Sequence, residues 1–307
     1  MRKGRLAVWL AGAAVLAAGI GGAAFWFVTE PRPAFPESQA AALEQPGDPD
    51  HGRLIFAAGD CASCHVRPGQ KDRTNLGGGL ALASPFGTLR VPNISSDPRD
   101  GIGKWRTIDL ANALMSGVSP AGQHYYPALP YVSFVHMTVE DLRDLMAYLR
   151  TLPPVSGKAP PHEMRFPFTV RRLVGFWKLL FFDRSPLSRE GSATVQRGRY
   201  LSEALAHCDE CHSSRNLLGG IKPSTRLAGG RDAEGTGWVP NITPSRIGGW
   251  SDDELVSLLR TGVTPQGNRV GSTMVGVVMN LSTLPESDVR AVAAYLRTVP
   301  PRPSPHP

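Results

Sequence analysis

The longest apolar segment of the chain lies at its N-terminus. Residues Leu6 to Val28 carry no charged side chain and are rich in Ala, Gly, Val and Leu, and a helix of this length can span a bilayer. Apolar cores of cleaved signal peptides are shorter, at about 7–15 residues. The pattern therefore favours an anchor that comprises residues 1–29 and is retained in the mature protein. Three of the first five residues are positively charged, which predicts a cytoplasmic N-terminus and an exported body.

Apolar positions after this anchor follow the period of helices. Two segments repeat them at the spacing of one helical face: Leu142, Leu145, Met146 and Leu149, and later Val289, Val292, Ala293 and Leu296. Ser251 followed by Glu254 is a capping box that opens a helix ending at Gly262. A similar apolar face ends at Gly117. The pattern predicts an all-α fold in which each helix buries one face.

Most of the remaining chain consists of two copies of one unit. Short motifs recur in order: Gly52-Arg53 and Gly198-Arg199, Val91-Pro92-Asn93-Ile94 and Val239-Pro240-Asn241-Ile242, Trp105 and Trp250, Ala147-Tyr148-Leu149-Arg150 and Ala294-Tyr295-Leu296-Arg297. Such an ordered series indicates a duplicated domain. We therefore expect an anchor at 1–29, a linker at 30–49, a first domain at 50–154, an interdomain linker at 155–194 and a second domain at 195–302.

Each copy contains the spacing Cys-x-x-Cys-His, at 61–65 and at 208–212. This spacing is typical of covalent haem c attachment, because two thiols on one turn can bond the porphyrin while the adjacent histidine ligates the iron. Two thiol pairs could also hold zinc, but zinc needs no histidine directly after each second cysteine. We expect two covalently bound haem c groups, held by Cys61, Cys64, Cys208 and Cys211, with His65 and His212 as iron ligands. Pro68, close behind His65, could offer a carbonyl to that ring's other nitrogen.

Composition excludes little and fits an exported, loop-rich protein. The 307 residues include 33 glycines and 28 prolines, and the formal net charge is +7. Three positive charges belong to the anchor, and the four propionates of two haems would lower the total to about +3. We therefore expect no nucleic-acid partner. The four cysteines are the only ones in the chain, so haem attachment leaves none for a disulfide or a catalytic thiolate.

The repeated unit resembles class I cytochrome c, through a Gly-Arg helix that leads into the haem motif and a closing helix with Ala-Tyr-Leu. The ordered set of Val-Pro-Asn-Ile, Gly-x-Trp and Gly-Val-x-Pro-x-Gly is similar more narrowly to the membrane-bound cytochrome c subunits of bacterial alcohol, aldehyde and gluconate dehydrogenases. The resemblance implies two tandem cytochrome c domains and a methionine as the sixth iron ligand. In the second copy Met274 occupies the expected place, with Met279 as an alternative.

The first copy departs from that pattern, because Leu129 stands where the methionine is expected and leucine cannot ligate iron. Met137, eight residues later, is favoured by the resemblance to related two-haem sequences and by the ligand type of this class. His124 and His136 are rivals, although lone histidines usually serve on the surface or in hydrogen bonds. An iron with no sixth ligand is the remaining possibility.

The segment from Phe166 to Phe182 is strongly aromatic and too charged to span a membrane. The simplest interpretation is a helix that packs between the two domains. A second interpretation is that its basic, aromatic surface rests on the membrane or docks a dehydrogenase.

These features predict an electron-transfer protein rather than an enzyme. The resemblance implies a dihaem cytochrome on the bacterial cytoplasmic membrane, with its haem domains facing the periplasm. It would accept electrons from a periplasmic dehydrogenase and pass them to quinone, a soluble cytochrome or a terminal oxidase. The alternative is a dihaem peroxidase, or a protein that binds peroxide or a gas at an open first haem, although no clear acid–base pair surrounds Leu129.

Overall fold

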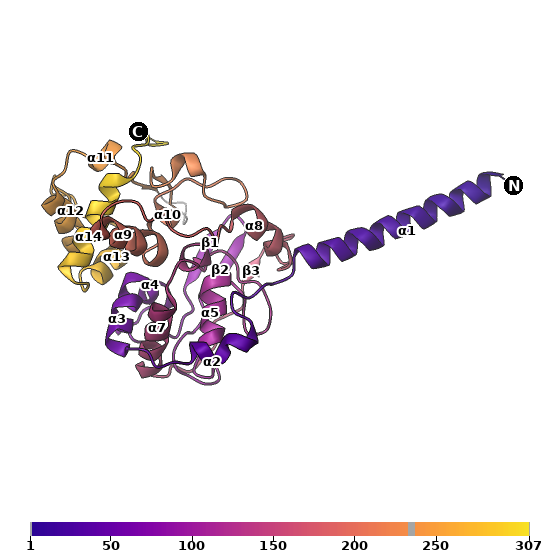
Figure 1. Cartoon of the computed structure of the whole chain (residues 1–307), viewed down its shortest axis with the longest axis horizontal. Coiled ribbons are helices and arrows are strands. Elements are labelled where there is room, and N and C mark those ends of the chain that lie inside the picture. Colours follow the sequence, from indigo (N-terminus) through magenta and orange to yellow (C-terminus); the bar gives the residue numbers. More distant parts are fainter. Residues whose placement is uncertain (1, 233–236, 307) are drawn as a thin grey trace.

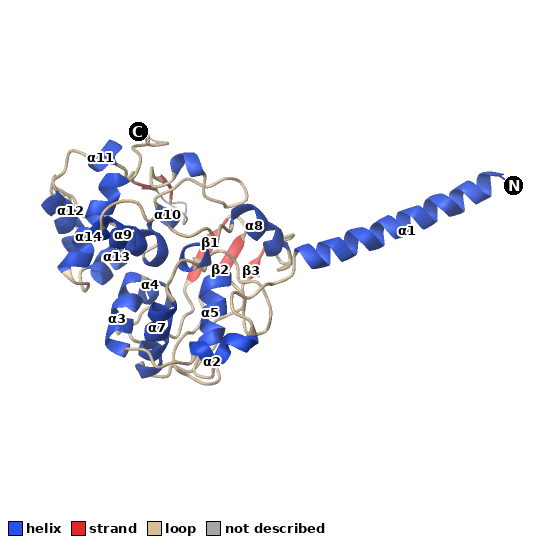
Figure 2. Ribbon diagram, in the orientation of Figure 1, coloured by secondary structure: helices blue, strands red, loops and turns tan. Residues whose placement is uncertain are grey.

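The computed structural model describes residues 2–232 and 237–306 of the chain. Helices dominate, and the strands are short (Figure 2). Helix α1 (Arg2–Val28) projects away from a body made by the rest of the chain (Figure 1). Its window Val8–Val28 is long and apolar enough to cross a membrane, and none of it is buried inside the protein.

The first half of the body surrounds the first cysteine motif. It contains η1 (Glu37–Gln39), α2 (Ala40–Leu43), α3 (Pro49–Ala58), α4 (Cys61–His65), β1 (Ala81–Ser84), β2 (Gly87–Arg90), α5 (Thr107–Ser116), α6 (Tyr131–Phe134) and α7 (Val139–Thr151). In the connecting segment, β3 (Glu163–Met164) pairs with β2 and α8 (Leu173–Phe181) follows. The antiparallel order β1-β2-β3 therefore ties the connecting segment to the first half.

The second half repeats this order of helices around the second motif. Its elements are α9 (Ala193–Arg199), the π-helical η2 (Tyr200–Leu205), α10 (Cys208–Cys211), η3 (Pro223–Thr225), β4 (Gly230–Arg231), β5 (Trp238–Val239), α11 (Pro244–Ile247), α12 (Asp252–Thr261), α13 (Met274–Leu281) and α14 (Glu286–Thr298). Helices α12 and α14 lie on the side of the body farthest from α1 (Figure 1). The fold is mostly helical, as predicted, and the two small sheets are an addition to that prediction.

A glycine sits where the first and last helices of each half cross. A Cβ built at Gly52 of α3 would lie 2.9 Å from the Cβ of Tyr148 on α7. The equivalent atom at Gly198 of α9 would lie 2.8 Å from the Cβ of Tyr295 on α14. Only glycine permits this approach of the two backbones. The same packing device therefore occurs in both halves.

The predicted helical faces are confirmed. All eight apolar positions predicted for the two closing helices are buried. Ser251 and Glu254 form the predicted capping box, with the Ser251 hydroxyl accepting from Glu254 N at 3.2 Å. Helices α5 and α12 end at Gly117 and Gly262, whose φ angles of 60° and 71° lie in the left-handed region that glycine tolerates.

Candidate functional site

Each cysteine motif forms one short helical turn. Cys61, Cys64 and His65 all belong to α4, while α10 ends at Cys211 with His212 as its C-cap. The residue before each motif is left-handed without being glycine, with φ of 52° at Asp60 and 39° at His207. Such conformations cost roughly 1–3 kcal/mol and collect at functional sites, and here both copies share the same one.

Both motif histidines are held by a proline carbonyl. Nδ1 of His65 donates to Pro92 O at 2.9 Å, and Nδ1 of His212 donates to Pro240 O at 2.8 Å. Nε2 of neither ring makes a hydrogen bond to the part of the chain that the structure describes. Fixing one ring nitrogen orients the other toward a metal. The prediction that Pro68 supplies this carbonyl is wrong, because the partner lies 27 residues along the chain from His65.

The partner prolines belong to the repeated Val-Pro-Asn-Ile motif, whose asparagines anchor it. Asn93 Nδ2 donates to Val155 O at 2.6 Å, and Asn241 Nδ2 donates to Arg302 O at 2.8 Å. Each side chain therefore ties its loop to the segment after the closing helix. The repeat of this motif in the sequence was the signal that could have identified Pro92 and Pro240.

Burial keeps the thiols and the imidazoles of both motifs in their neutral forms near pH 7. Burial raises the pKa of the Cys61 and Cys208 thiols to about 12 and that of Cys211 to about 11. Burial also lowers the pKa of His65 to about 4 and lowers that of His212. The imidazoles are thus neutral near pH 7, which is the form that ligates a metal. Two thiols and a neutral, oriented imidazole on one turn fit covalently attached haem.

The predicted sixth ligands lie at different places in the two halves: Met137 comes directly before the closing helix α7, whereas Met274 opens α13, one helix ahead of α14. Met137 is buried, with 4% of its surface exposed, and directly precedes Thr138, which caps α7. Met274 opens α13 and is partly buried against the core that also contacts Cys208. Leu129 is partly buried in a turn ahead of α6, where its N–H donates to Tyr126 O at 3.1 Å.

The rival ligands have other surroundings. His124 is buried, and its Nε2 donates to Thr29 O at 2.9 Å just beyond α1. His136 is half-buried, and burial is the main cause that lowers its pKa. Met279 is 49% exposed on α13. His124 is therefore engaged at the base of α1, His136 is half-buried, and Met279 faces solvent.

The two motifs approach each other across the boundary between the halves. A Cβ built at Gly276, two residues after Met274, would lie 2.4 Å from Ser63 Oγ inside the first motif. Asn280 of α13 donates to the Asp60 carboxylate ahead of that motif. The second motif contacts the first half in turn: the ring of His207, directly ahead of that motif, packs edge-on against Phe134 of α6, with ring centroids 5.7 Å apart. Each motif thus contacts the ligand-bearing region of the other half.

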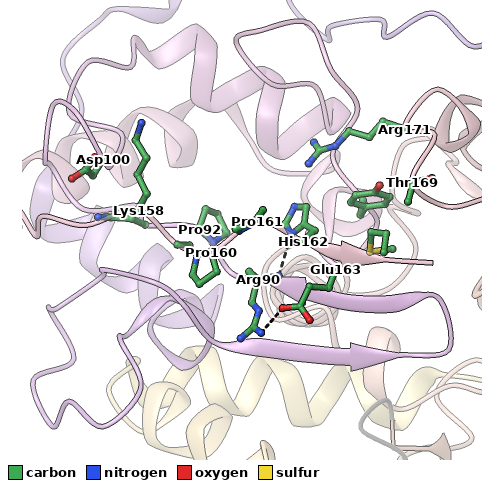
Figure 3. A pocket seen from close by; sticks show the side chains of 14 residues that line it. Arg90, Pro92, Asp100, Lys158, Pro160, Pro161, His162, Glu163, Thr169 and Arg171 are labelled. Atoms are coloured by element: carbon green, nitrogen blue, oxygen red, sulfur yellow. Dashed lines mark hydrogen bonds and ion pairs between the residues drawn. The ribbon is translucent and has the colours of Figure 1, made fainter. Parts of the chain in front are cut away.

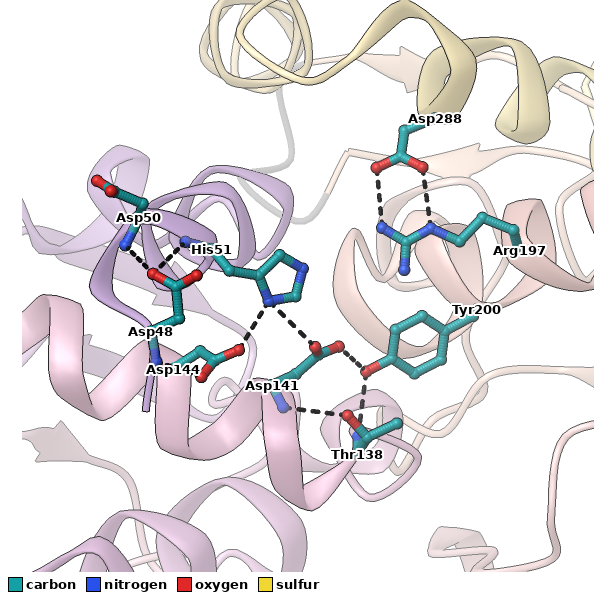
Figure 4. Close-up of polar contacts among 9 residues, drawn as sticks. All are labelled: Asp48, Asp50, His51, Thr138, Asp141, Asp144, Arg197, Tyr200 and Asp288. Carbon is teal, nitrogen blue, oxygen red and sulfur yellow. Dashed lines mark hydrogen bonds and ion pairs between the residues drawn. The ribbon is translucent and has the colours of Figure 1, made fainter. Parts of the chain in front are cut away.

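A polar cluster beside this boundary was not identified from the sequence (Figure 4). His51 Nδ1 lies 2.8 Å from Asp144 Oδ2 and 3.7 Å from Asp141 Oδ1. Tyr200 of the second half donates to Asp141 and accepts from Thr138 N at 3.1 Å. The cluster therefore links the two halves through one hydroxyl.

The repeat could have revealed part of this cluster. The residue before Gly198 is Arg197, at the place that His51 holds before Gly52. Arg197 forms a two-point ion pair with Asp288, at 2.9 Å and 2.8 Å (Figure 4). At this helix crossing the first half has a histidine and two carboxylates. The second half has an arginine and one carboxylate at the equivalent crossing.

A cavity of about 600 Å³ lies between the Pro92 loop and the connecting segment (Figure 3). Its lining includes the cationic Arg90, Lys158 and Arg171, and Arg90 pairs with Glu163 at 2.6 Å. The lining does not include either cysteine or the histidine of the first motif. The cavity thus borders the loop that holds His65 without containing the predicted haem attachment residues.

Comparisons with known proteins identify one family. The cytochrome c family model matches residues 49–153. A diheme cytochrome c-type protein of Cereibacter sphaeroides is 45% identical over 284 residues, which cover 92% of this chain and 95% of that protein. The fructose dehydrogenase cytochrome subunit of Gluconobacter japonicus is 37% identical over 81% of this chain and 52% of that subunit.

A third relative is the cytochrome c subunit of the quinone alcohol dehydrogenase of Gluconacetobacter polyoxogenes, 30% identical over 90% of this chain and 62% of that subunit. The chain therefore matches the Cereibacter protein along nearly its whole length. It spans only about half to three fifths of the two dehydrogenase subunits.

Proposed function

Since the chain belongs to the cytochrome c family, as a relative of dihaem c-type cytochromes, we propose that it is a membrane-tethered electron relay with two covalently bound haem c groups. The observation that carries this proposal is the recurrence of one site. Each half sets Cys-x-x-Cys-His on a helical turn and ties the histidine to the proline of Val-Pro-Asn-Ile. Residues 50–154 and 195–302 are the two cytochrome c domains of this proposal, and the glycine crossings at Gly52 and Gly198 support it.

His65 and His212 are the proximal iron ligands in this proposal, and Met137 and Met274 are the distal ones. Burial of Met137 and the bond of His124 to Thr29 support this choice in the first domain. Iron with both axial positions filled exchanges single electrons and has no open position for a substrate. The chain itself attaches, orients and shields the two groups, and it acts as an electron carrier rather than as an enzyme.

The boundary between the halves supports electron transfer from one haem to the other. The first motif lies directly against α13, the helix that Met274 opens, where a Cβ at Gly276 would lie 2.4 Å from Ser63 Oγ. Direct packing of the first motif against the helix that Met274 opens favours a relay, because the two sites lie against a shared boundary.

Helix α1 is the membrane anchor in this proposal, with the body on the periplasmic side of the cytoplasmic membrane. The window Val8–Val28 and the positive residues ahead of it support this orientation. The electron donor would be a periplasmic dehydrogenase, since relatives are named as cytochrome subunits of dehydrogenases for fructose and alcohol. The acceptor would be quinone, a soluble cytochrome or a terminal oxidase.

Haem content tests the two-haem proposal directly. The purified full-length protein should give two haem c groups per chain by pyridine haemochrome assay and intact mass. Replacing Cys61 and Cys64 by alanine, or Cys208 and Cys211 by alanine, should leave one. A wild-type chain with a single haem, or with zinc in place of haem, would overturn it. Reduction of the haems by membranes supplied with alcohol, fructose or gluconate would then identify the donor.

A further inference from the structure

Exposed apolar side chains of the body gather in one region. Outside α1, the described residues expose ten large apolar side chains, and seven of them lie in the connecting segment or in one loop of the second half. These seven define the apolar face: Phe166, Val170, Phe176, Leu179, Leu180, Leu217 and Leu218. Leu179 and Leu180 are each 65% exposed and Phe166 is 83% exposed. A cluster of this kind marks an interaction surface.

Helix α8, which carries three of these side chains, is packed against the last turn of α1. The Phe176 ring lies 5.6 Å from the Phe25 ring, centroid to centroid. The Arg172 guanidinium lies 4.0 Å from the centre of the Trp26 ring and also donates to Trp26 O. Phe25 and Trp26 belong to the window Val8–Val28. If α1 spans the bilayer, α8 must therefore lie at the bilayer boundary.

The opposite side of α8 is held firmly by the body. Lys178 Nζ donates to Ser116 O at 2.6 Å and to Gly117 O at 2.9 Å, at the C-terminal end of α5. Burial, aided by nearby Arg184, lowers the pKa of Lys178 to about 7. Trp177 Nε1 donates to Leu218 O at 2.9 Å. These contacts fix the rotation of α8, so its outward stripe of Phe176, Leu179 and Leu180 cannot turn inward.

Charge favours a lipid surface over an apolar protein partner. Apart from the partly buried Lys178, residues 165–189 carry five Arg and one Asp, a net charge of +4. Basic, aromatic helices with one apolar stripe bind the boundary between headgroups and acyl chains, and anionic lipids strengthen that binding. A partner protein would need an acidic rim around an apolar patch. A lipid surface is already close to α8, because the anchor α1 ends beside it.

We propose that α8 and the apolar face lie in the membrane interface, as a second, monotopic contact that holds the two haem domains in a fixed orientation beside α1. This inference rests on the proposed role of α1 as an anchor. The apolar stripe would enter the bilayer by about 5–10 Å, while Arg172 remains at the level of the headgroups beside Trp26. The orientation of both haem domains relative to the bilayer then follows from two contacts instead of one flexible tether.

Spin labels on the full-length holoprotein test this contact. Labels at Leu179→Cys and Phe166→Cys are compared with one at Ser257→Cys, an exposed position on α12 far from α1. The protein is placed in phosphatidylcholine vesicles with and without phosphatidylglycerol, and vesicle flotation checks the anchor separately. We expect labels 179 and 166 to be severalfold more accessible to oxygen than to a water-soluble nickel chelate, relative to label 257. Phosphatidylglycerol should increase the difference.

The outcomes separate the two proposals. If the protein floats with the vesicles but label 179 matches label 257, the anchor stands and the membrane contact of α8 is overturned. Protection of label 179 only after addition of a dehydrogenase complex would also overturn it, in favour of protein docking. If the protein does not float, the anchor fails, and the membrane contact fails with it.

Discussion

Replacing Gly198 by alanine should destabilise the second half, because α9 and α14 touch at this position. The added Cβ would lie 1.8 Å from Ala291 O and 2.8 Å from the Cβ of Tyr295. Carbon atoms in contact settle about 3.5–4.0 Å apart, so the two helices must move apart by roughly 1–2 Å. Overpacking of this kind typically costs about 1–3 kcal/mol and occasionally more.

In a helix interior without steric conflict, alanine stabilises the helix by about 1 kcal/mol relative to glycine. A loss of stability in Gly198→Ala would therefore indicate a steric conflict at the crossing. Because a built Cβ this close to a backbone oxygen lies beyond the usual overpacking range, we expect a net loss of about 2 kcal/mol in the free energy of unfolding. For a domain of this size, that corresponds to a fall of roughly 8–16 °C in the melting temperature.

The assay is thermal unfolding of the full-length holoprotein in detergent, followed by Soret-region circular dichroism. Gly52→Ala should have the same effect on the first half, where the Cβ would meet Asp144 O and Tyr148. Gly249→Ala is the matched control, because nothing lies within 4 Å of its built Cβ. A melting temperature for Gly198→Ala equal to that of Gly249→Ala would refute the close crossing of α9 and α14.

Four further substitutions probe the boundary, the connecting helix and the iron ligands. Tyr200→Phe removes the hydroxyl bound to Asp141 and should lower the free energy of unfolding by about 1–2 kcal/mol in denaturant titration; an unchanged midpoint would contradict the link between the halves. The pKa of Lys178 is lowered from 10.5 to about 7 in the folded protein, so the unfolded chain binds more protons between these two pH values, and stability rises with pH across that window. Lys178→Met should flatten that rise in thermal melts, and an equal rise in both proteins would show that Lys178 is not its source. Met137→Leu should remove about half of the sulfur-to-iron charge-transfer band of the oxidised protein, whereas Met279→Leu should leave it intact; an undiminished band in Met137→Leu would contradict Met137 as the ligand of the first haem, and a halved band in Met279→Leu would give Met279 the place of Met274.

Local patterns in the sequence predicted the helices well because they depend on neighbouring residues. The capping box at Ser251 and Glu254 and the glycine ends at Gly117 and Gly262 are set within one or two turns. The buried faces of α7 and α14 follow from helical periodicity alone. The order of the repeated motifs likewise predicted that the second half would repeat the helices of the first.

Contacts between distant residues were harder to predict. The carbonyl partner of His65 was sought nearby at Pro68, but the loop that supplies it returns only at Pro92, after the β1-β2 hairpin. The two-residue strand β3 exists only because the connecting segment passes along β2. The packing of α8 against Phe25 and Trp26 likewise depends on where α1 leaves the body. Tertiary placement decides each of these contacts, and no local pattern records it.

Iron coordination tests the proposed relay most directly. Low-temperature paramagnetic resonance and near-infrared magnetic circular dichroism of the oxidised full-length protein should show two low-spin irons, each with one histidine and one methionine ligand. Carbon monoxide added to the reduced protein should leave the Soret band unchanged, because both axial positions of each iron are filled. A high-spin iron, or a first haem that binds carbon monoxide, would contradict the relay and place ligand binding or peroxide chemistry at that haem.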